Sequence, residues 1–315
     1  MKISLIIPCY NEEESLPPLY EELKKVTGSM PDYDFEMIFV DDGSKDRTLP
    51  ILKEFAAIDD RITYISFSRN FGKEAAMYAG FCNVSGDYAA VMDADMQHPP
   101  SLVPEMIKIL ESGGYDSVAA RRTTRKGEGK IRSFFSRCFY KVMNKISDAH
   151  MEQGATDFRL MRRDMVDAIV AMSENNRFSK GIFGWVGFKT YWLPYENVER
   201  VAGKSKWNFF GLLKYSTDGI TNFSSTPLKL ASWSGIFFTL CSVVMFAFIF
   251  ARSLMYPYYS VEGWPSTVCL ILFIGGVQLF SLGIMGQYIS KMYMEVKNRP
   301  HYIVSQTNKK DIVKK

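Results

Sequence analysis

Two long apolar stretches near the C-terminal end place the strongest limit on how this chain can fold. They cover residues 231–251 and 265–289, and each is close to the roughly 20 residues that a helix needs to cross the hydrocarbon core of a bilayer. Inside lipid every backbone polar group needs a partner within the protein, and a helix meets this requirement with its own backbone. We therefore predict two transmembrane helices, joined by the short loop 252–264.

Basic residues flank these two stretches unevenly. The loop between them contains Arg252 as its basic residue, and several basic residues lie beyond their outer ends: Lys229, Lys291, Lys297 and Arg299. Lys and Arg collect in cytoplasmic segments. We therefore predict a multi-pass protein of the plasma membrane whose N-terminal region and C-terminal tail, 291–315, are both cytoplasmic. We expect the lysine-rich residues 308–315 to be a mobile, solvated end.

Residues 1–120 alternate short apolar runs with amphipathic segments. The runs lie near 3–7, 36–40, 62–66, 88–92 and 117–120. Strands that alternate with helices are typical of a doubly wound, mainly parallel sheet. The first run is too short for the core of a signal peptide and leads directly into acidic residues, so we expect a buried strand there. We predict an α/β domain over 1–206, an interfacial approach helix over 207–230 and the transmembrane hairpin over 231–290.

A basic amphipathic helix is predicted over 131–146. Its apolar residues recur at helical spacing, and its basic residues lie off that stripe: Arg132, Arg137, Lys141 and Lys145. The pattern fits either a helix that packs on the core with a solvated basic face, or an interfacial helix that lies on anionic lipid. The two apolar stretches farther along the chain favour the second interpretation.

Acidic residues follow two of the predicted strands. Asp93 and Asp95 come directly after the fourth apolar run, and Asp41 and Asp42 come after the second. Ligands bind beyond the carboxyl ends of parallel strands, so we expect both pairs at one edge of the sheet. Neighbouring carboxylates repel one another, and Mg²⁺ or Mn²⁺ relieves that repulsion while also binding phosphates. Each pair alone could instead be solvated, or belong to a turn in which Ser44 caps a helix.

The composition excludes several other kinds of site. The five cysteines are scattered and form no C-x-x-C pair, so we expect neither a disulfide framework nor a zinc site. A net charge of +4 over 315 residues is too small for a general polyanion binder, so we expect no nucleic acid partner. The histidines at 98, 150 and 301 are dispersed, and we assign them no role.

Five motifs occur in an order that is typical of one enzyme family. They are Pro8-Cys9-Tyr10-Asn11-Glu12, Val40-Asp41-Asp42-Gly43-Ser44, Asn70-Phe71-Gly72-Lys73, Asp93-Ala94-Asp95-Met96-Gln97-His98-Pro99-Pro100 and Asp157-Phe158-Arg159. With these motifs the chain resembles the family 2 glycosyltransferases. With its two-span tail it resembles their polyprenyl-phosphate branch, which comprises dolichol-phosphate mannose synthases and the bacterial undecaprenyl-phosphate (bactoprenol) glucosyl and N-acetylglucosaminyl transferases. The resemblance implies a GT-A type fold, followed by interfacial helices and a two-helix transmembrane hairpin.

The resemblance also implies which residues bind the sugar donor. The nucleoside would be framed by Pro8, Tyr10, Glu12, Val40 and Asp42. The ribose and diphosphate would lie against Asp93 and Ala94, and the metal ion, Mg²⁺ or Mn²⁺, would be held by Asp93, Asp95 and Gln97. The remaining donor-binding positions are basic: Arg121, and a pair that closes on the diphosphate, Arg200 and Lys206.

For the catalytic step the resemblance points to Asp95, through the metal, and to Asp157. Asp157 matches the position of a candidate general base, and a role in positioning the acceptor or Arg159 is an equal alternative. Basic residues of the region 121–145 would bind the acceptor phosphate at the membrane surface: Arg122, Arg132 and Arg137. A general affinity of these residues for the membrane surface predicts almost the same behaviour.

The implied reaction is an inverting, metal-dependent transfer of a hexose from UDP-glucose or UDP-N-acetylglucosamine to undecaprenyl phosphate in a bacterial plasma membrane. Because the acceptor phosphate is already an anion, it needs little help from a general base. The alternatives are a GDP-mannose-dependent polyprenyl-phosphate mannose synthase and a non-catalytic membrane scaffold of the same fold. The presence of the metal-site and basic residues favours an enzyme. We expect a homo-oligomer, and a separate flippase and downstream transferase as partners, because two spans are too few for a flippase.

Overall fold

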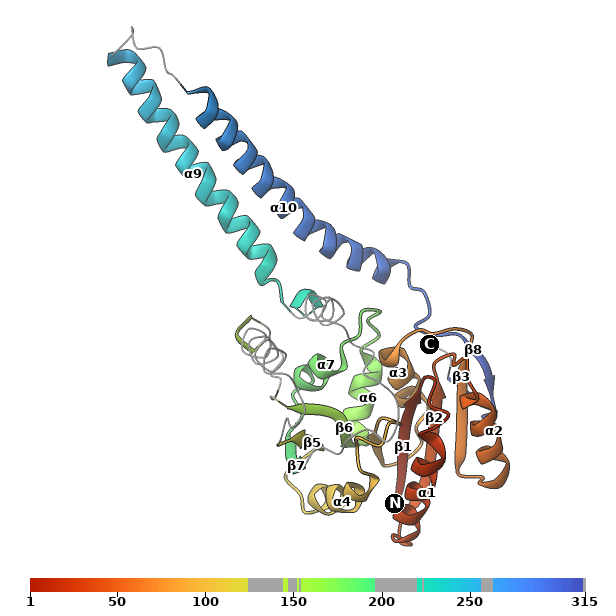
Figure 1. Cartoon of the computed structure of the whole chain (residues 1–315). Coiled ribbons are helices and arrows are strands. Elements are labelled where there is room, and N and C mark those ends of the chain that lie inside the picture. The colour runs from red at the N-terminus through yellow and green to blue at the C-terminus, as the bar shows by residue number, and fades with distance from the viewer. Residues whose placement is uncertain are drawn as a thin grey trace. The chain divides into compact units, whose positions relative to one another are not determined.

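Two compact units make up the chain in the computed structural model, which describes residues 1–123, 144–146, 152, 154–195, 220–222, 224–255 and 263–313. The first unit contains Met1–Gly219 together with Asn298–Lys315 (Figure 1). The second unit is Ile220–Lys297. The C-terminal residues therefore belong to the same unit as the N-terminal domain.

An eight-stranded sheet forms the centre of the first unit, in the order β7-β5-β6-β4-β1-β2-β3-β8. Its strands are β1 (Lys2–Cys9), β2 (Asp34–Asp41), β3 (Ile62–Phe67), β4 (Tyr88–Val91), β5 (Ser117–Arg122), β6 (Ala155–Arg162), β7 (Thr190–Tyr195) and β8 (Val304–Thr307). β1 pairs in parallel with β2 and β4, β2 with β3, and β5 with β7, whereas β6 and β8 run antiparallel to their neighbours. The prediction of a mainly parallel α/β sheet is confirmed, and all five predicted strands are present.

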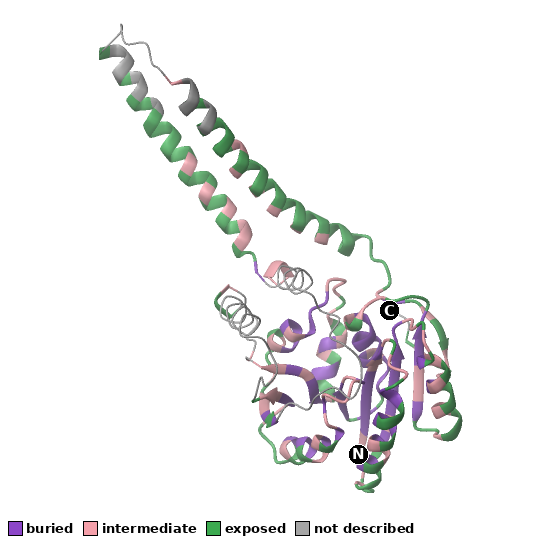
Figure 2. Ribbon diagram, in the orientation of Figure 1, coloured by how far each residue is buried: buried purple, intermediate pink, exposed green. Residues whose placement is uncertain are grey.

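Helices cover both faces of this sheet. They are α1 (Leu16–Gly28), α2 (Thr48–Ile58), α3 (Lys73–Asn83), the 3-10 helix η1 (Pro100–Leu102), α4 (Val103–Glu111), α6 (Arg163–Ala171) and α7 (Ser179–Trp185). α1 buries Leu16, Leu19 and Leu23, whose spacing of three and four residues gives the helix one apolar face. The outer faces of the helices are exposed, and the strands β1, β2 and β4 are mostly buried (Figure 2).

The central strand β1 is covered on both faces. Leu5, Ile6 and Ile7 are all fully buried, which is the pattern of a parallel strand between two layers of helices. On one face α3 packs closely, because a Cβ atom added at Gly80 would collide with the side chain of Ile6. The position of α3 fixes its first residue, Lys73, near the carboxyl ends of the strands.

The C-terminal tail is docked on the edge of the sheet through β8. The hydroxyl group of Thr307 donates to the carbonyl oxygen of Tyr64 in β3 at 2.7 Å. The ring of Tyr302 is buried and stacks on Phe67, with 4.9 Å between the ring centroids. Farther along, the amide N–H of Val313 donates to the side chain of Asn83 at 3.0 Å. Residues 308–313 are thus hydrogen-bonded to the first unit, and most of them are exposed to solvent, as expected for 308–315.

The second unit contains two long apolar helices, α9 (Thr226–Met255, 30 residues) and α10 (Trp264–Val296, 33 residues). At about 1.5 Å per residue, each is longer than the roughly 30 Å of a hydrocarbon core. Among the residues that the structure describes, two segments are long and apolar enough to cross a membrane, Thr226–Met245 and Leu270–Val296. The helices contact one another through Phe238 and Phe273, whose rings meet edge to face at 5.5 Å. This arrangement agrees with the predicted hairpin.

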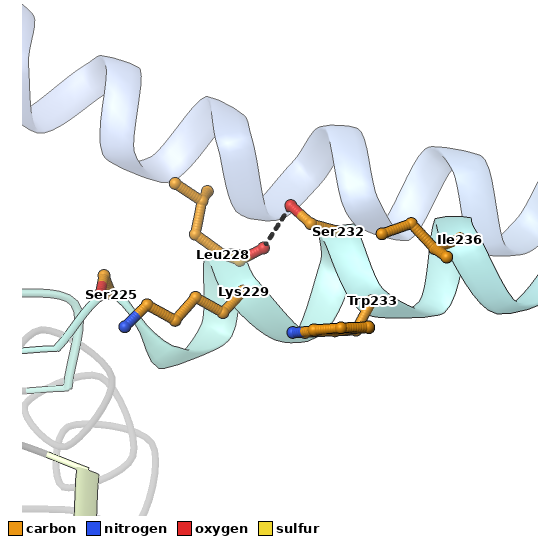
Figure 3. A pocket seen from close by; sticks show the side chains of 6 residues that line it. All are labelled: Ser225, Leu228, Lys229, Ser232, Trp233 and Ile236. Carbon is orange, nitrogen blue, oxygen red and sulfur yellow. Dashed lines mark hydrogen bonds between the residues drawn. The ribbon is translucent and has the colours of Figure 1, made fainter.

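The first turns of α9 carry a shallow hollow on one side of the helix (Figure 3). It is lined by Ser225, Leu228, Lys229, Ser232, Trp233 and Ile236. Lys229 and Trp233 lie one helical turn apart on the same side, and a basic residue beside a tryptophan is typical of the level of the lipid headgroups. None of these six residues was predicted to bind a substrate.

Most of the two predicted interfacial segments lies outside the described residues. Of the amphipathic helix expected over 131–146, the structure describes 144–146, which are helical. Of the approach helix expected over 207–230, it describes 220–222 as helical, and α9 begins within that range at Thr226. Both segments remain predictions.

The stacking of Tyr302 on Phe67 leads to a test of the docked tail. Large aromatic-to-alanine changes in cores cost about 3–5 kcal/mol, and at this sheet edge we expect Tyr302→Ala to cost on the order of 2 kcal/mol. Amide hydrogen exchange of residues 303–307 in the full-length protein should then accelerate at least tenfold. The matched control is Ser305→Ala, an exposed change in the same strand, which should leave exchange unchanged. Equal protection in the two variants would contradict the docking.

Candidate active site

The carboxyl edge of the sheet brings together acidic residues from separate strands. Asp42 follows β2 and Asp93 follows β4, and both strands run in parallel with β1. Asp157 belongs to β6, which runs in the opposite direction, so its position near the start of that strand lies at the same edge. The structure thus gathers three of the predicted site residues.

A loop that follows β3 holds the side chain of Asp42. The backbone N–H groups of Phe71 and Gly72 donate to the carboxylate at 2.6 and 2.9 Å. Gly72 has a φ of 100°, a conformation that residues with a side chain rarely adopt. Burial raises the pKa of Asp42 to about 6, although the two N–H groups act to lower it. Asp42 is thus ionised at neutral pH and is fixed in direction.

Asp41, the neighbour of Asp42, has a structural role. Its carboxylate accepts hydrogen bonds from the hydroxyl group of Ser66 at 2.7 Å and from the backbone N–H of Ser44 at 3.0 Å. The hydroxyl oxygen of Ser44 accepts from the N–H of Asn11 at 2.9 Å. Ser44 therefore joins two loops, and the alternative in which it caps the next helix is wrong, because α2 begins later, at Thr48.

The other residues that were predicted to bind the nucleoside lie in the loop after β1 or beneath it. The N–H of Glu12 donates to the hydroxyl group of Thr48 at 2.8 Å, and its carboxylate accepts from the hydroxyl group of Ser15 at 2.6 Å. Pro8 and Tyr10 are partly exposed at the end of β1. Val40 is fully buried, so it supports the loop from within the core.

Lys73 joins two of the acidic residues. Its ammonium group lies 2.6 Å from Oδ1 of Asp93 and 2.7 Å from Oδ2 of Asp157. Burial would raise the pKa of Asp157, but Lys73, together with Lys180, outweighs it and holds the pKa well below its ordinary range. Burial would likewise lower the pKa of Lys73, but the two carboxylates outweigh it and raise that pKa. At neutral pH all three groups are charged.

Sequence reasoning missed Lys73 as a site residue. The motif 70–73 was noticed, but nothing in the sequence indicates that its lysine contacts two carboxylates 20 and 84 residues away. Only the antiparallel insertion of β6 brings Asp157 into reach of α3.

His98 was also missed, and it organises the loop that carries Asp93. Its Nδ1 atom accepts a hydrogen bond from the backbone N–H of Asp93 at 3.1 Å. The ring is buried and stacks on Phe158, with 5.4 Å between the centroids. Burial lowers the pKa of His98, although Asp93 acts to raise it. The ring is therefore neutral and carries its proton on Nε2.

Two residues predicted to hold a metal ion, Asp95 and Gln97, lie close together in the sequence, and both side chains carry oxygen atoms. Oδ1 of Asp95 accepts a hydrogen bond from the N–H of Gln97 at 3.1 Å, and Met96 between them has a φ of 60°. Ala94 is buried. Within the described part of the chain no three His, Cys, Asp or Glu side chains gather as a ready-made metal site. A carboxylate and an amide oxygen fit Mg²⁺ or Mn²⁺ when substrate phosphates supply further ligands.

Two arginines at the end of β5 extend this site. Arg122 donates to Oε1 of Gln97 at 3.1 Å and to the hydroxyl group of Tyr195 at 3.1 Å, so a residue predicted for the acceptor lies beside a metal-site residue. Arg121 forms an ion pair with Glu152 at 2.9 Å. The other predicted basic residues lie outside the described residues: Arg132, Arg137, Arg200 and Lys206.

A second buried layer lies behind Lys73. The carboxylate of Glu74 accepts hydrogen bonds from the N–H of Ser179, at 3.0 Å, and from its hydroxyl group. Burial, helped by Asp157, raises the pKa of Glu74 to about 7. Arg159 is buried with its guanidinium group 3.6 Å from the ring centroid of Phe183, and burial lowers its pKa to about 9. These groups hold β6 and α7 in place next to the site.

The sequence matches a known family over more than half of its length. The model of the family described as Glycosyl transferase family 2 matches residues 4–170. This range contains β1 to β6, and with them the loops that carry Asp42, Asp93, Asp95 and Asp157.

Several curated proteins are similar over nearly the whole chain. The SfII prophage-derived bactoprenol glucosyl transferase of Shigella flexneri is 40% identical over 309 residues, covering 98% of this chain and 99% of that protein. The prophage bactoprenol glucosyl transferase homolog of Escherichia coli (strain K12) is 38% identical, covering 98% and 100%. CsbB of Bacillus subtilis (strain 168), which has a provisional glycosyltransferase name, is 47% identical over 306 residues, covering 97% and 92%. The similarity therefore includes both apolar helices.

Glu74 offers a test of the buried layer by pH. Its folded pKa of about 7 exceeds its ordinary value of 4.5, so the stability it contributes is present below the lower value and is lost as pH rises through the higher one. The full loss corresponds to roughly 3 kcal/mol. Glu74→Gln keeps an acceptor for Ser179 without the charge, so its thermal unfolding midpoint should exceed that of the wild type by several degrees near pH 8.5 and by little near pH 5.

Tryptophan fluorescence of the detergent-solubilised protein measures these midpoints. The exposed change Glu105→Gln on α4 is the control, and its difference from the wild type should not depend on pH. If the effect of Glu74→Gln is the same at both pH values, the raised pKa of Glu74 is wrong.

Proposed function

Because this chain belongs to glycosyl transferase family 2, and is therefore a glycosyltransferase, we propose that it transfers glucose from UDP-glucose to undecaprenyl phosphate. The observation that carries this proposal is the 40% identity to a bactoprenol glucosyl transferase over 98% of the chain, apolar helices included. Of the two sugars expected from the sequence, glucose is favoured by the names of these relatives, and UDP is carried over from the resemblance that the sequence shows. UDP-N-acetylglucosamine and GDP-mannose are the donors to be compared with it.

We assign the nucleoside to the loops after β1 and β2. Asp42 is ionised at neutral pH and is aimed by two N–H groups, and a carboxylate has further lone pairs with which to accept a hydrogen bond from the base or ribose. Pro8, Tyr10 and Glu12 lie on the neighbouring loop. The hydrogen bonds between these loops give a site that is formed before the donor binds.

The diphosphate and its metal ion are assigned to the loop after β4. Asp95 and Gln97 would hold Mg²⁺ or Mn²⁺, which when bound neutralises charge on the departing diphosphate. Asp93 is already paired with Lys73, so we assign Asp95 as the principal carboxylate ligand. We also propose that three basic residues contact the donor: Arg121, Arg200 and Lys206.

The proposed acceptor is a phosphate monoester, and this favours positioning over general base catalysis as the role of Asp157. Lys73 and Lys180 hold the pKa of Asp157 far below neutral, so Asp157 is a weak base. A phosphate oxygen that is already anionic attacks the anomeric carbon in line, the bond from that carbon to the β-phosphate oxygen breaks, and its electron pair leaves with the diphosphate. Asp157 therefore acts by positioning, and inversion follows from a single displacement.

We propose a bacterial plasma membrane protein with both termini in the cytoplasm. β8 pairs with β3, so residues after α10 must return to the side of the membrane on which the sheet lies. Two crossings meet this requirement, and the basic residues outside the hairpin favour the cytoplasmic side. The product would then form on the cytoplasmic face, and a separate flippase and a downstream transferase would use it. A homo-oligomer remains part of this proposal.

The proposed reaction is tested by transfer of radiolabelled sugar to undecaprenyl phosphate in detergent. With Mg²⁺ or Mn²⁺, UDP-glucose should label the lipid more rapidly than UDP-N-acetylglucosamine or GDP-mannose. Asp95→Asn should lower the rate at least 100-fold, because the metal loses its principal carboxylate, and a chelator should do the same. Asp60→Asn, an exposed change at the end of α2, is the control and should keep the wild-type rate. Labelling from a different donor, or none, would overturn the choice of glucose.

The topology is tested with reporter fusions in bacterial cells. Alkaline phosphatase, which is active outside the cytoplasm, should be active when inserted between residues 255 and 263 and inactive when fused after residue 315. A fluorescent protein that folds only in the cytoplasm should give the opposite result. Active phosphatase at the C-terminal end would contradict the cytoplasmic tail.

A further inference from the structure

Lys73 stands at the centre of the acidic edge without an assigned function. It is the first residue of α3 and the last residue of the motif 70–73. Its ammonium group contacts Asp93, which follows β4, and Asp157, which belongs to β6, at 2.6 and 2.7 Å. It therefore joins the loop proposed for the diphosphate to the strand proposed for the acceptor.

The geometry leaves the ammonium group able to bind a further anion. A lysine ammonium group has three N–H donors, and the two carboxylates take two of them. The side chain keeps 43% of its surface open to solvent, whereas the side chain of Asp157 keeps 16%. The carboxylates thus fix the ammonium group, while part of the lysine side chain remains exposed to solvent.

The charge balance of this edge requires such a cation. Asp42, Asp93, Asp95 and Asp157 all lie at or near it, and phosphate-bearing substrates add more negative charge. A lysine acts on a phosphate as a compact point charge, and the N-terminus of α3 adds positive potential beside it. Without Lys73, the carboxylates of Asp93 and Asp157 would lose the ammonium group that contacts both of them.

We propose that Lys73 binds a phosphate oxygen of the reacting substrates through its remaining N–H, and that Asp93 and Asp157 fix the direction of its ammonium group. This inference rests on the proposed function, which supplies two sources of that oxygen. One is the diphosphate of the donor, and the other is the phosphate of the lipid acceptor.

The surroundings of Lys73 hold it in position. Gly72 precedes it and is bound through its N–H to Asp42. Phe71 packs edge-on against Phe67, with 5.7 Å between the ring centroids, and Phe67 in turn stacks on Tyr302 of the tail. The lysine therefore begins α3 directly after a short, anchored loop, which favours a fixed charge over a mobile surface side chain.

The competing explanation is that Lys73 serves only as a structural counter-ion of Asp157. A double variant distinguishes this role from phosphate binding. If Lys73 serves only to neutralise Asp157, then Asp157→Asn should make Lys73 dispensable, and Lys73→Met in that background should have no effect. If Lys73 binds phosphate, Lys73→Met should still weaken binding when Asp157 is already Asn. The double variant also leaves no uncompensated carboxylate at position 157, so it keeps the test valid should Lys73→Met alone fail to fold.

The experiment measures the affinity of the full-length protein in detergent for pairs of ligands that differ only in phosphate. UDP is compared with uridine for the donor arm, and undecaprenyl phosphate with undecaprenol for the acceptor arm. We expect Lys73→Met to weaken binding at least tenfold for the phosphate-bearing member of one pair, and to leave its phosphate-free partner unchanged. Lys73→Arg, which keeps the charge, should lose less.

Lys2→Met is the matched control. Lys2 forms an ion pair with Glu36 at 2.9 Å and keeps 41% of its side chain exposed, close to the exposure of Lys73, but it lies at the start of β1. Its replacement should leave all four affinities unchanged.

The outcomes separate this inference from the proposed function. Equal affinities of Lys73→Met and wild type for both phosphate ligands would overturn the role of Lys73, as would recovery of binding in the double variant. If the wild type binds UDP through Lys73 but transfers no glucose, the choice of reaction fails while the role of Lys73 stands.

Discussion

The reversed direction of β6 is the constraint on which the rest of the site depends. In a sheet of parallel strands, residues at the beginning of a strand lie at the edge opposite to the ligands. Because β6 runs antiparallel to β4 and β5, Asp157 lies at the edge of the sheet where β4 ends. There the ammonium group of Lys73 contacts both Asp157 and Asp93. If β6 ran parallel to β4, Asp157 would lie at the opposite edge of the sheet. The ion-pair network is thus a consequence of topology.

The C-terminal tail also supports the candidate site. The ring of Tyr302 in the tail stacks on Phe67, and Phe67 contacts Phe71. The backbone N–H of Phe71 donates to the carboxylate of Asp42. A segment that follows the apolar hairpin therefore supports a loop proposed to bind the nucleoside. The segments before and after the hairpin thus belong to one folded unit.

The sequence predicted the elements whose energy comes from burial of regular apolar patterns. The five strands with continuous apolar runs and the two long apolar helices are present, as expected. β6 was missed because the charged Arg159 interrupts its pattern, and the structure accommodates this residue by covering its guanidinium group with Phe183. β8 was missed because it is short and polar, and its stability comes from backbone pairing and from side chains that bond to β3. Lys73 and His98 were missed because their partners are set by tertiary structure.

The electrostatics of the edge fit a reaction with an anionic nucleophile. A general base for a sugar hydroxyl group needs a pKa near neutral pH, and desolvation of a lone buried carboxylate would provide one. Here Lys73 and Lys180 outweigh desolvation at Asp157, whereas at Glu74 burial outweighs the hydrogen bonds from Ser179 and raises the pKa to about 7. Lys73 and Asp157 are thus both charged at neutral pH, whereas Glu74 behind them titrates close to neutral pH. An edge arranged in this way can orient a phosphate, and it has no need to remove a proton from it.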